Sequence, residues 1–93
     1  MIVGCLQVEI YIPGAASLKE KRSVVKSLIR RCQNKFNASV VELNAKDVWR
    51  RAVIGVAICG DSREQIERKL QFVLNFIETD VNCEVIAVHT ELR

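Results

Sequence analysis

The order of secondary structure is decided first by residues 2–29, which read IVGCLQVEIYIPGAASLKEKRSVVKSLI. Apolar residues alternate along Ile2–Ile12, and this period of two predicts a strand with one buried face. The Pro-Gly pair at 13–14 ends the strand, because proline has no amide hydrogen for a sheet and glycine permits a turn. Ser17, three residues before Glu20, is a capping-box pattern, so a helix is predicted to begin there.

The rest of the chain repeats the same alternation of strands and helices. The first helix is predicted to end near Asn37, and its apolar side chains recur with a period of 3.6. Two β-rich segments, 39–43 and 48–59, flank a polar turn and predict an antiparallel hairpin. A second capping pattern at Ser62 starts another amphipathic helix, and residues 85–92 form a last strand.

The predicted order βαββαβ indicates an α+β fold of the ferredoxin-like type. We expect one ferredoxin-like domain over residues 1–93, with a four-stranded antiparallel sheet and two helices on one face. The first and third strands are expected in the middle of the sheet and parallel to each other. In that arrangement Cys5 and Cys59 would lie several residues apart.

Composition excludes several classes of protein. Hydrophobic residues make up 49% of the 93 residues and charged residues 27%, which is typical of a globular chain and not of a disordered one. The longest apolar run, 52–60, is too short to cross a membrane, and the N-terminus does not resemble a signal peptide. We therefore expect a cytoplasmic protein that makes no membrane contact.

The four cysteines are spread through the chain with no C-x-x-C pair, and His89 is the single histidine. Zinc sites need clustered ligands, so no metal site is expected. We predict four free thiols that act as small hydrophobic residues in a reducing compartment. Glu9 and Glu42 look like isolated strand carboxylates, and no catalytic constellation is visible, so neither an enzyme activity nor a cofactor is predicted.

A sheet with both helices on one face leaves its other face open. The first and third strands would present a half-apolar surface there, which a monomer rarely exposes to water. We expect a homodimer or a larger homo-oligomer through this face. Its predicted contact residues are Val3, Cys5, Tyr11, Val53 and Ala57. Base stacking in the manner of an RNA-recognition motif is not favoured, because Tyr11 is the sole aromatic residue expected there.

Charge is concentrated in the first helix. The net charge is +3, yet residues 19–35 hold seven cations and one acid, a local charge of +6. At about 100° per residue, four of these cations fall within roughly 80° of one another. This basic stripe consists of Lys19, Arg22, Lys26 and Arg30. In the second helix, by contrast, acids and bases recur at i,i+4 spacing and are expected to pair.

The predicted hairpin tip adds a second group of cations around one aromatic ring. This group consists of Lys46, Trp49, Arg50 and Arg51. An unneutralised basic stripe is typical of a protein that binds a polyanion, and an indole ring can stack on a base. The alternative is an ordinary solvated helix face with no ligand.

Several motifs resemble the YlxP-like family of small bacterial proteins, a domain of unknown function. The resemblance is carried by Ile12-Pro13-Gly14, the run SLKEKR at 17–22, Lys35-Phe36-Asn37 with Ser39-Val40, and Asp47, Trp49 and Arg51. It implies a ferredoxin-like fold and no established activity. Genes of that family often lie near those for a transcription elongation factor, a translation initiation factor and a ribosome-binding factor.

Together, the stripe and the resemblance favour a non-enzymatic accessory factor that binds RNA or the ribosome. The alternative is a dimeric regulatory module of the ACT type, which would hold a small molecule or another protein. ACT modules share the predicted topology and often carry Pro-Gly after their first strand, as at 13–14 here.

Overall fold

The computed structural model describes residues 1–43 and 48–93. The predicted order βαββαβ is confirmed, and several helix and strand boundaries differ from the predicted ones by one to three residues. The elements are β1 (Ile2–Tyr11), α1 (Leu18–Lys35), β2 (Ser39–Leu43), β3 (Arg51–Gly60), α2 (Arg63–Glu78) and β4 (Glu84–Leu92).

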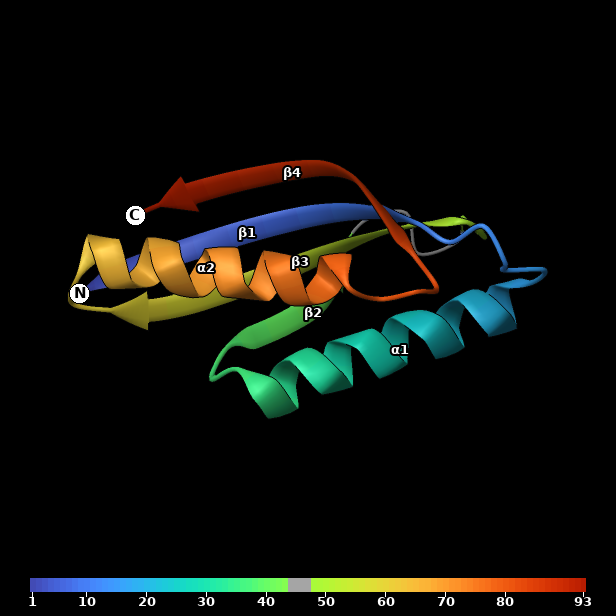
Figure 1. Cartoon of the computed structure of the whole chain (residues 1–93), viewed down its shortest axis with the longest axis horizontal. Coiled ribbons are helices and arrows are strands. Elements are labelled where there is room, and N and C mark those ends of the chain that lie inside the picture. Colours follow the sequence, from blue (N-terminus) through green and yellow to red (C-terminus); the bar gives the residue numbers. More distant parts are fainter. Residues whose placement is uncertain (44–47) are drawn as a thin grey trace.

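The four strands form a single sheet in the order β2-β3-β1-β4, and every neighbouring pair is antiparallel. Both helices pack on the same side of this sheet (Figure 1). This arrangement confirms the predicted ferredoxin-like fold. None of the described helices is both long enough and apolar enough to span a membrane.

One expectation about the central strands is wrong: β1 and β3 are antiparallel, not parallel. The helix α1 returns the chain to the side from which it started, so β2 runs in the direction of β1, and the hairpin then reverses β3. In the observed register Val3 lies opposite Cys59, and Cys5 lies opposite Ala57. The two cysteines are therefore diagonal neighbours on one face of the sheet. All four cysteines are free thiols.

The core lies between the sheet and the helices. Alternate residues of β1, from Leu6 to Ile10, are almost fully buried, and the same alternation buries Ile54 on β3. The α2 residues Ile66, Leu70, Val73 and Ile77 cover them. Burying each such side chain contributes about 1.5–3 kcal/mol. At Gly4 the helix approaches closely, because a Cβ there would lie 2.3 Å from Cγ2 of Ile66.

The ends of α1 show how local sequence sets its length. At the start, the Glu20 amide donates to Oγ of Ser17 over 3.2 Å, and the Ala16 amide donates to Oε2 of Glu20 over 2.6 Å. The helix ends at Lys35, before the predicted Asn37, because Phe36 takes an extended conformation. There its ring packs edge-on against Phe76 of α2, with 5.6 Å between centroids.

Candidate nucleic-acid interface

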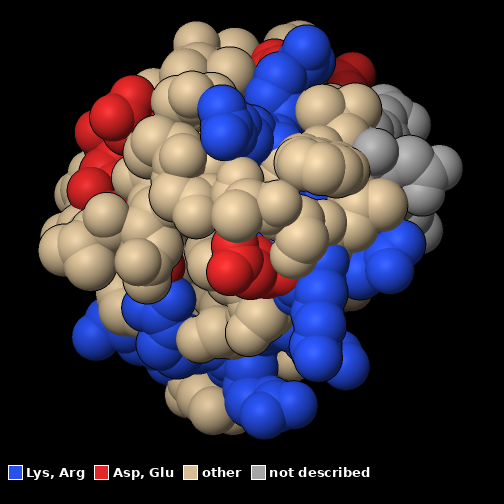
Figure 2. Space-filling model, turned by 90° about the vertical axis from the view of Figure 1, so that its right-hand side faces the viewer, with Lys and Arg blue, Asp and Glu red and all other residues tan. Residues whose placement is uncertain are grey.

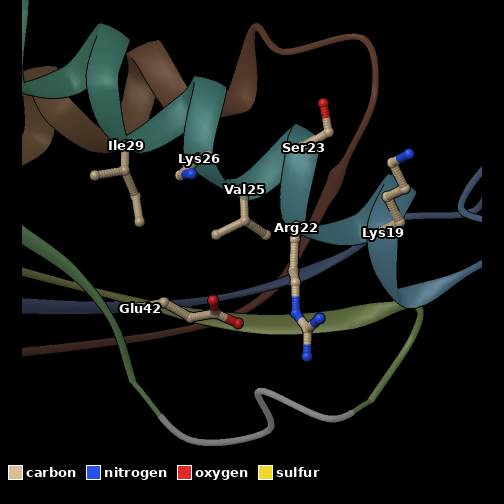
Figure 3. A pocket seen from close by; sticks show the side chains of 7 residues that line it. All are labelled: Lys19, Arg22, Ser23, Val25, Lys26, Ile29 and Glu42. Atoms are coloured by element: carbon tan, nitrogen blue, oxygen red, sulfur yellow. The ribbon is translucent and has the colours of Figure 1, made fainter.

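A groove runs between α1 and β2, and its volume is 650 Å³. This α1 groove is lined by Lys19, Arg22, Ser23, Val25, Lys26, Ile29 and Glu42. Figure 3 shows Val25 and Ile29 pointing from α1 toward the strands of the sheet, and these two side chains form the apolar floor of the groove. Arg22 extends from α1 into the same space that Glu42 enters from β2. The volume is within the range of small-molecule sites in proteins.

The basic stripe borders this groove. Lys19, Arg22, Lys26 and Arg30 are all exposed, and the first three line the groove. Within residues 1–43 and 48–93, none of the four forms an ion pair with an acid. Figure 2 shows Lys and Arg side chains gathered over α1 in the lower part of this view. The positive charge of α1 is therefore concentrated where the groove opens.

Lys21 was counted among the cations of this helix, but its side chain is completely buried. Its Nζ lies 2.9 Å from Oε2 of Glu42, whose side chain is 18% exposed. Glu42 is thus not the isolated carboxylate that the sequence indicated. No hydrogen-bond donor among the described residues is well aligned with this oxygen, so the contact is an ion pair rather than a linear hydrogen bond. This ion pair links α1 to β2 next to the groove.

The residues of the predicted basic cluster at the hairpin tip differ in their exposure and in their contacts. Trp49 is 51% exposed, and Lys46 lies outside the described residues. Nε of Arg50 donates to the Ala15 carbonyl over 3.2 Å, which ties the start of β3 to the loop after β1.

Arg51 is already occupied by an acid. One of its Nη atoms lies 2.5 Å from Oε1 of Glu9, on the sheet face opposite the helices. Glu9 is therefore not isolated either. The ion pair neutralises the charge of Arg51 and holds it on the sheet face that points away from the α1 groove. The basic surface that remains for a ligand is centred on α1, with Trp49 and Arg50 at the hairpin.

The open sheet face presents the predicted contact residues, all of them half-buried. They are Val3, Cys5, Tyr11, Val53 and Ala57. Two apolar residues of β2 that the sequence did not single out, Val41 and Leu43, extend this face. Leu43 leans over Gly55, where a Cβ would lie 2.7 Å from its Cδ1. The face is thus broader than β1 and β3 alone would make it.

A third group of polar side chains joins the ends of the two helices. Asp80 is buried, and its carboxylate accepts from Arg31 over 2.5 Å and from the Asn82 amide over 2.7 Å. Burial, together with the nearby charge of Asp80, raises the pKa of Cys83 to about 11. Burial also raises the pKa of Cys32. Both thiols are protonated at neutral pH and are poor nucleophiles.

The i,i+4 pairs expected in α2 do not close in the structure. Arg63, Glu64, Glu67 and Arg68 are exposed, and none of them forms an ion pair within the described part of the chain. The acids nevertheless remain beside the bases, so α2 lacks the unbalanced charge of α1. Among residues 1–43 and 48–93, no group of three His, Cys, Asp or Glu side chains is placed to hold a metal ion.

Fold and surface together define a small α+β protein of the ferredoxin-like class. A solution structure of a de novo designed protein with a ferredoxin fold matches all of this chain and 86% of that one, with a TM-score of 0.57 and 16% identity. The chain belongs to the family described as "Protein of unknown function (DUF503)", whose model matches residues 3–90.

A natural relative supports the same assignment. The "Uncharacterized protein YlxP" of Bacillus subtilis strain 168 is 42% identical over 90 residues, which cover 97% of this chain and 98% of that protein. The resemblance to YlxP-like proteins is therefore confirmed. Neither the family nor this relative has an assigned activity.

Proposed function

We propose that this protein is a non-enzymatic cytoplasmic accessory factor that binds single-stranded RNA, including RNA exposed on the ribosome. One observation carries the proposal: the α1 groove is bordered by exposed cations that have no acidic partner among the described residues. From Lys19 to Arg30 the stripe extends about 16 Å along the helix, at roughly 1.5 Å per residue. That length suits a short run of phosphates.

Phosphate contacts make binding depend on salt, because each neutralised phosphate releases counterions. Four contacts to single-stranded RNA predict a slope of log K against log salt near −3, at roughly −0.7 per contact. Replacing Arg22 and Lys26 with Ala should flatten the slope by about 1.4. Alanine keeps the helix stable, so the fold should survive.

The matched control is Arg63→Ala with Arg68→Ala, which removes the same charge from exposed positions of α2. Fluorescence anisotropy with a labelled uridine oligonucleotide, at three salt concentrations, measures all three proteins. We expect the control to keep the slope of the original protein. Equal slopes in all three would show that the stripe is only a solvated helix face.

Self-association through the open sheet face belongs to the same proposal. The occupant we propose is a second copy of this chain, because the part of the face on β2 and β3 is apolar and its two ends carry both charges, in Glu9–Arg51 and Glu91–Arg93. A two-fold axis would place such a surface against itself. Sedimentation at micromolar concentration should show a dimer or larger species, and Ala57→Lys should dissociate it while Asn75→Lys on α2 should not. A monomeric original protein would exclude this interface.

The second candidate function is a dimeric ACT-like module that binds a small molecule. The observation in its favour is a cavity of 380 Å³ beside Pro13 and Gly14, closed on another side by Val81 and Asn82. Melting temperatures measured with amino acids and with RNA separate the two functions. A shift with an amino acid and none with RNA would favour the ACT-like function.

A further inference from the structure

We infer that the α1 groove is a guanine-selective base pocket, an inference that rests on the proposed binding of single-stranded RNA. The groove combines an apolar floor, a cationic border and one carboxylate, that of Glu42. These three features fit different parts of one nucleotide. Bases of unpaired RNA are commonly recognised by contacts to their planar faces and Watson–Crick edges.

Glu42 argues against a phosphate inside the groove. A carboxylate accepts hydrogen bonds and donates none, so it repels a phosphate and attracts N–H groups. The buried Lys21 holds it through the 2.9 Å ion pair, and the side chain keeps 18% exposure where it lines the groove. Phosphates are therefore expected on the exposed cations at the border, and a hydrogen-bond donor is expected inside.

The arrangement of donors and acceptors selects among the bases. Guanine presents two adjacent donors, N1–H and the N2 amino group, beside the acceptor O6. Uracil presents a single donor between two acceptors, while adenine and cytosine present one amino group beside an acceptor nitrogen. Oε2 of Glu42 is buried against Lys21, so Oε1 is the oxygen that can face a ligand. Guanine fits this groove best, with Oε1 of Glu42 accepting from N1–H and N2 and Arg22, on the same groove, donating to O6. Figure 3 shows these two side chains entering the groove from opposite walls.

The apolar floor supplies the remaining contact. Val25 is buried and Ile29 is half-buried, and both lie on α1, the helix from which Arg22 also extends. A base edge held by Glu42 would lay its ring against Ile29 and remove apolar surface from water, whereas Val25, at 2% exposure, has almost no surface left to cover. The ribose and phosphates would then lie outward, at Lys19 and Lys26.

The test compares labelled oligouridylates that carry one central guanosine, inosine, adenosine or uridine, each titrated with the whole protein at one salt concentration. We expect the guanosine oligonucleotide to bind at least about 5-fold more tightly than the uridine one, which is the lower end for a two-hydrogen-bond contact to a base. Inosine, which lacks the N2 amino group, should fall between them.

Three variants assign the preference to the groove. Glu42→Gln and Arg22→Ala should each reduce the guanosine-to-uridine ratio toward one, and circular dichroism checks that each variant is folded. Arg22 is exposed, so that variant remains informative even if Glu42→Gln unfolds. Arg30→Ala is the matched control, because Arg30 belongs to the stripe but does not line the groove. It should weaken binding to every oligonucleotide and leave the ratio unchanged.

Each outcome separates this inference from the function beneath it. Salt-dependent binding with equal affinity for all four oligonucleotides would overturn the guanine pocket and leave RNA binding intact. A guanosine preference that survives both groove substitutions would place recognition elsewhere and also overturn the pocket. Absence of binding to any oligonucleotide would overturn the proposed function together with this inference.

Discussion

Replacing Lys21 with methionine should destabilise the protein strongly although Lys21 belongs to a helix rich in exposed cations. The methionine side chain keeps most of the length of the lysine and removes its charge. Glu42 would then remain 82% buried without the partner 2.9 Å away. The expected cost therefore comes from an unpaired carboxylate rather than from a cavity.

The size of the effect follows from the geometry. At an effective dielectric constant of about 20, opposite charges at this separation attract by roughly 6 kcal/mol, and desolvation of both groups offsets much of that. Removing one partner of a buried pair typically costs about 3–5 kcal/mol. A chain of this length has a total stability of roughly 5–14 kcal/mol, so the variant loses a large share of it.

Urea unfolding followed by far-ultraviolet circular dichroism measures the loss. The matched control is Lys26→Met, the same substitution at an exposed position of α1, which should change the free energy of unfolding by no more than about 0.5 kcal/mol. Glu42→Gln and the double variant complete a cycle that should give a coupling energy of about 0.5–3 kcal/mol. If Lys21→Met costs no more than Lys26→Met, the ion pair does not hold α1 to the sheet.

Two further predictions concern close packing and a buried thiol. Gly4→Ala places a Cβ 2.3 Å from Ile66 and should cost about 1–3 kcal/mol in urea unfolding, whereas Gly14→Ala, which meets nothing within 4 Å, should have a much smaller effect. Because burial raises the pKa of Cys83 to about 11, the unfolded thiol ionises first and stability should fall as the pH rises from about 9 toward 11. Cys83→Ala should lower stability at neutral pH and reduce that alkaline loss. A variant with an unchanged alkaline loss would contradict the assignment to Cys83.

The parts of the fold that could be predicted are those set by local pattern. The alternation along β1, the Ser17 and Glu20 cap and the two helical stripes each depend on residues close together in sequence. The relative direction of β1 and β3 depends instead on how α1 returns the chain, and the prediction of parallel strands was wrong.

The candidate site could be predicted only in part, for a related reason. Its exposed cations follow from helical spacing, but the ion pairs of Glu9 and Glu42 join residues far apart in sequence. The helical spacing does indicate that Lys21 is buried, since it lies four residues before Val25 and seven before Leu28, on the buried stripe of α1. Lys21 counts toward the local charge of +6, yet its side chain is completely buried. The α1 groove also depends on how β2 is placed beside α1, which no local pattern supplies.

The strand order of the sheet also determines the order in which the strands can pair during folding. β2 and β3 are joined as a hairpin and can pair early, and each helix forms from neighbouring residues. β1 must wait, because its partners are β3 and β4, and Gly4 meets Leu92 near the other end of the chain. Such distant pairings slow folding, since a long loop must close before the contacts can form. During synthesis β1 leaves the ribosome before β3 and β4, so it must wait for both partners, and until then its unpaired edges are open to association with other chains.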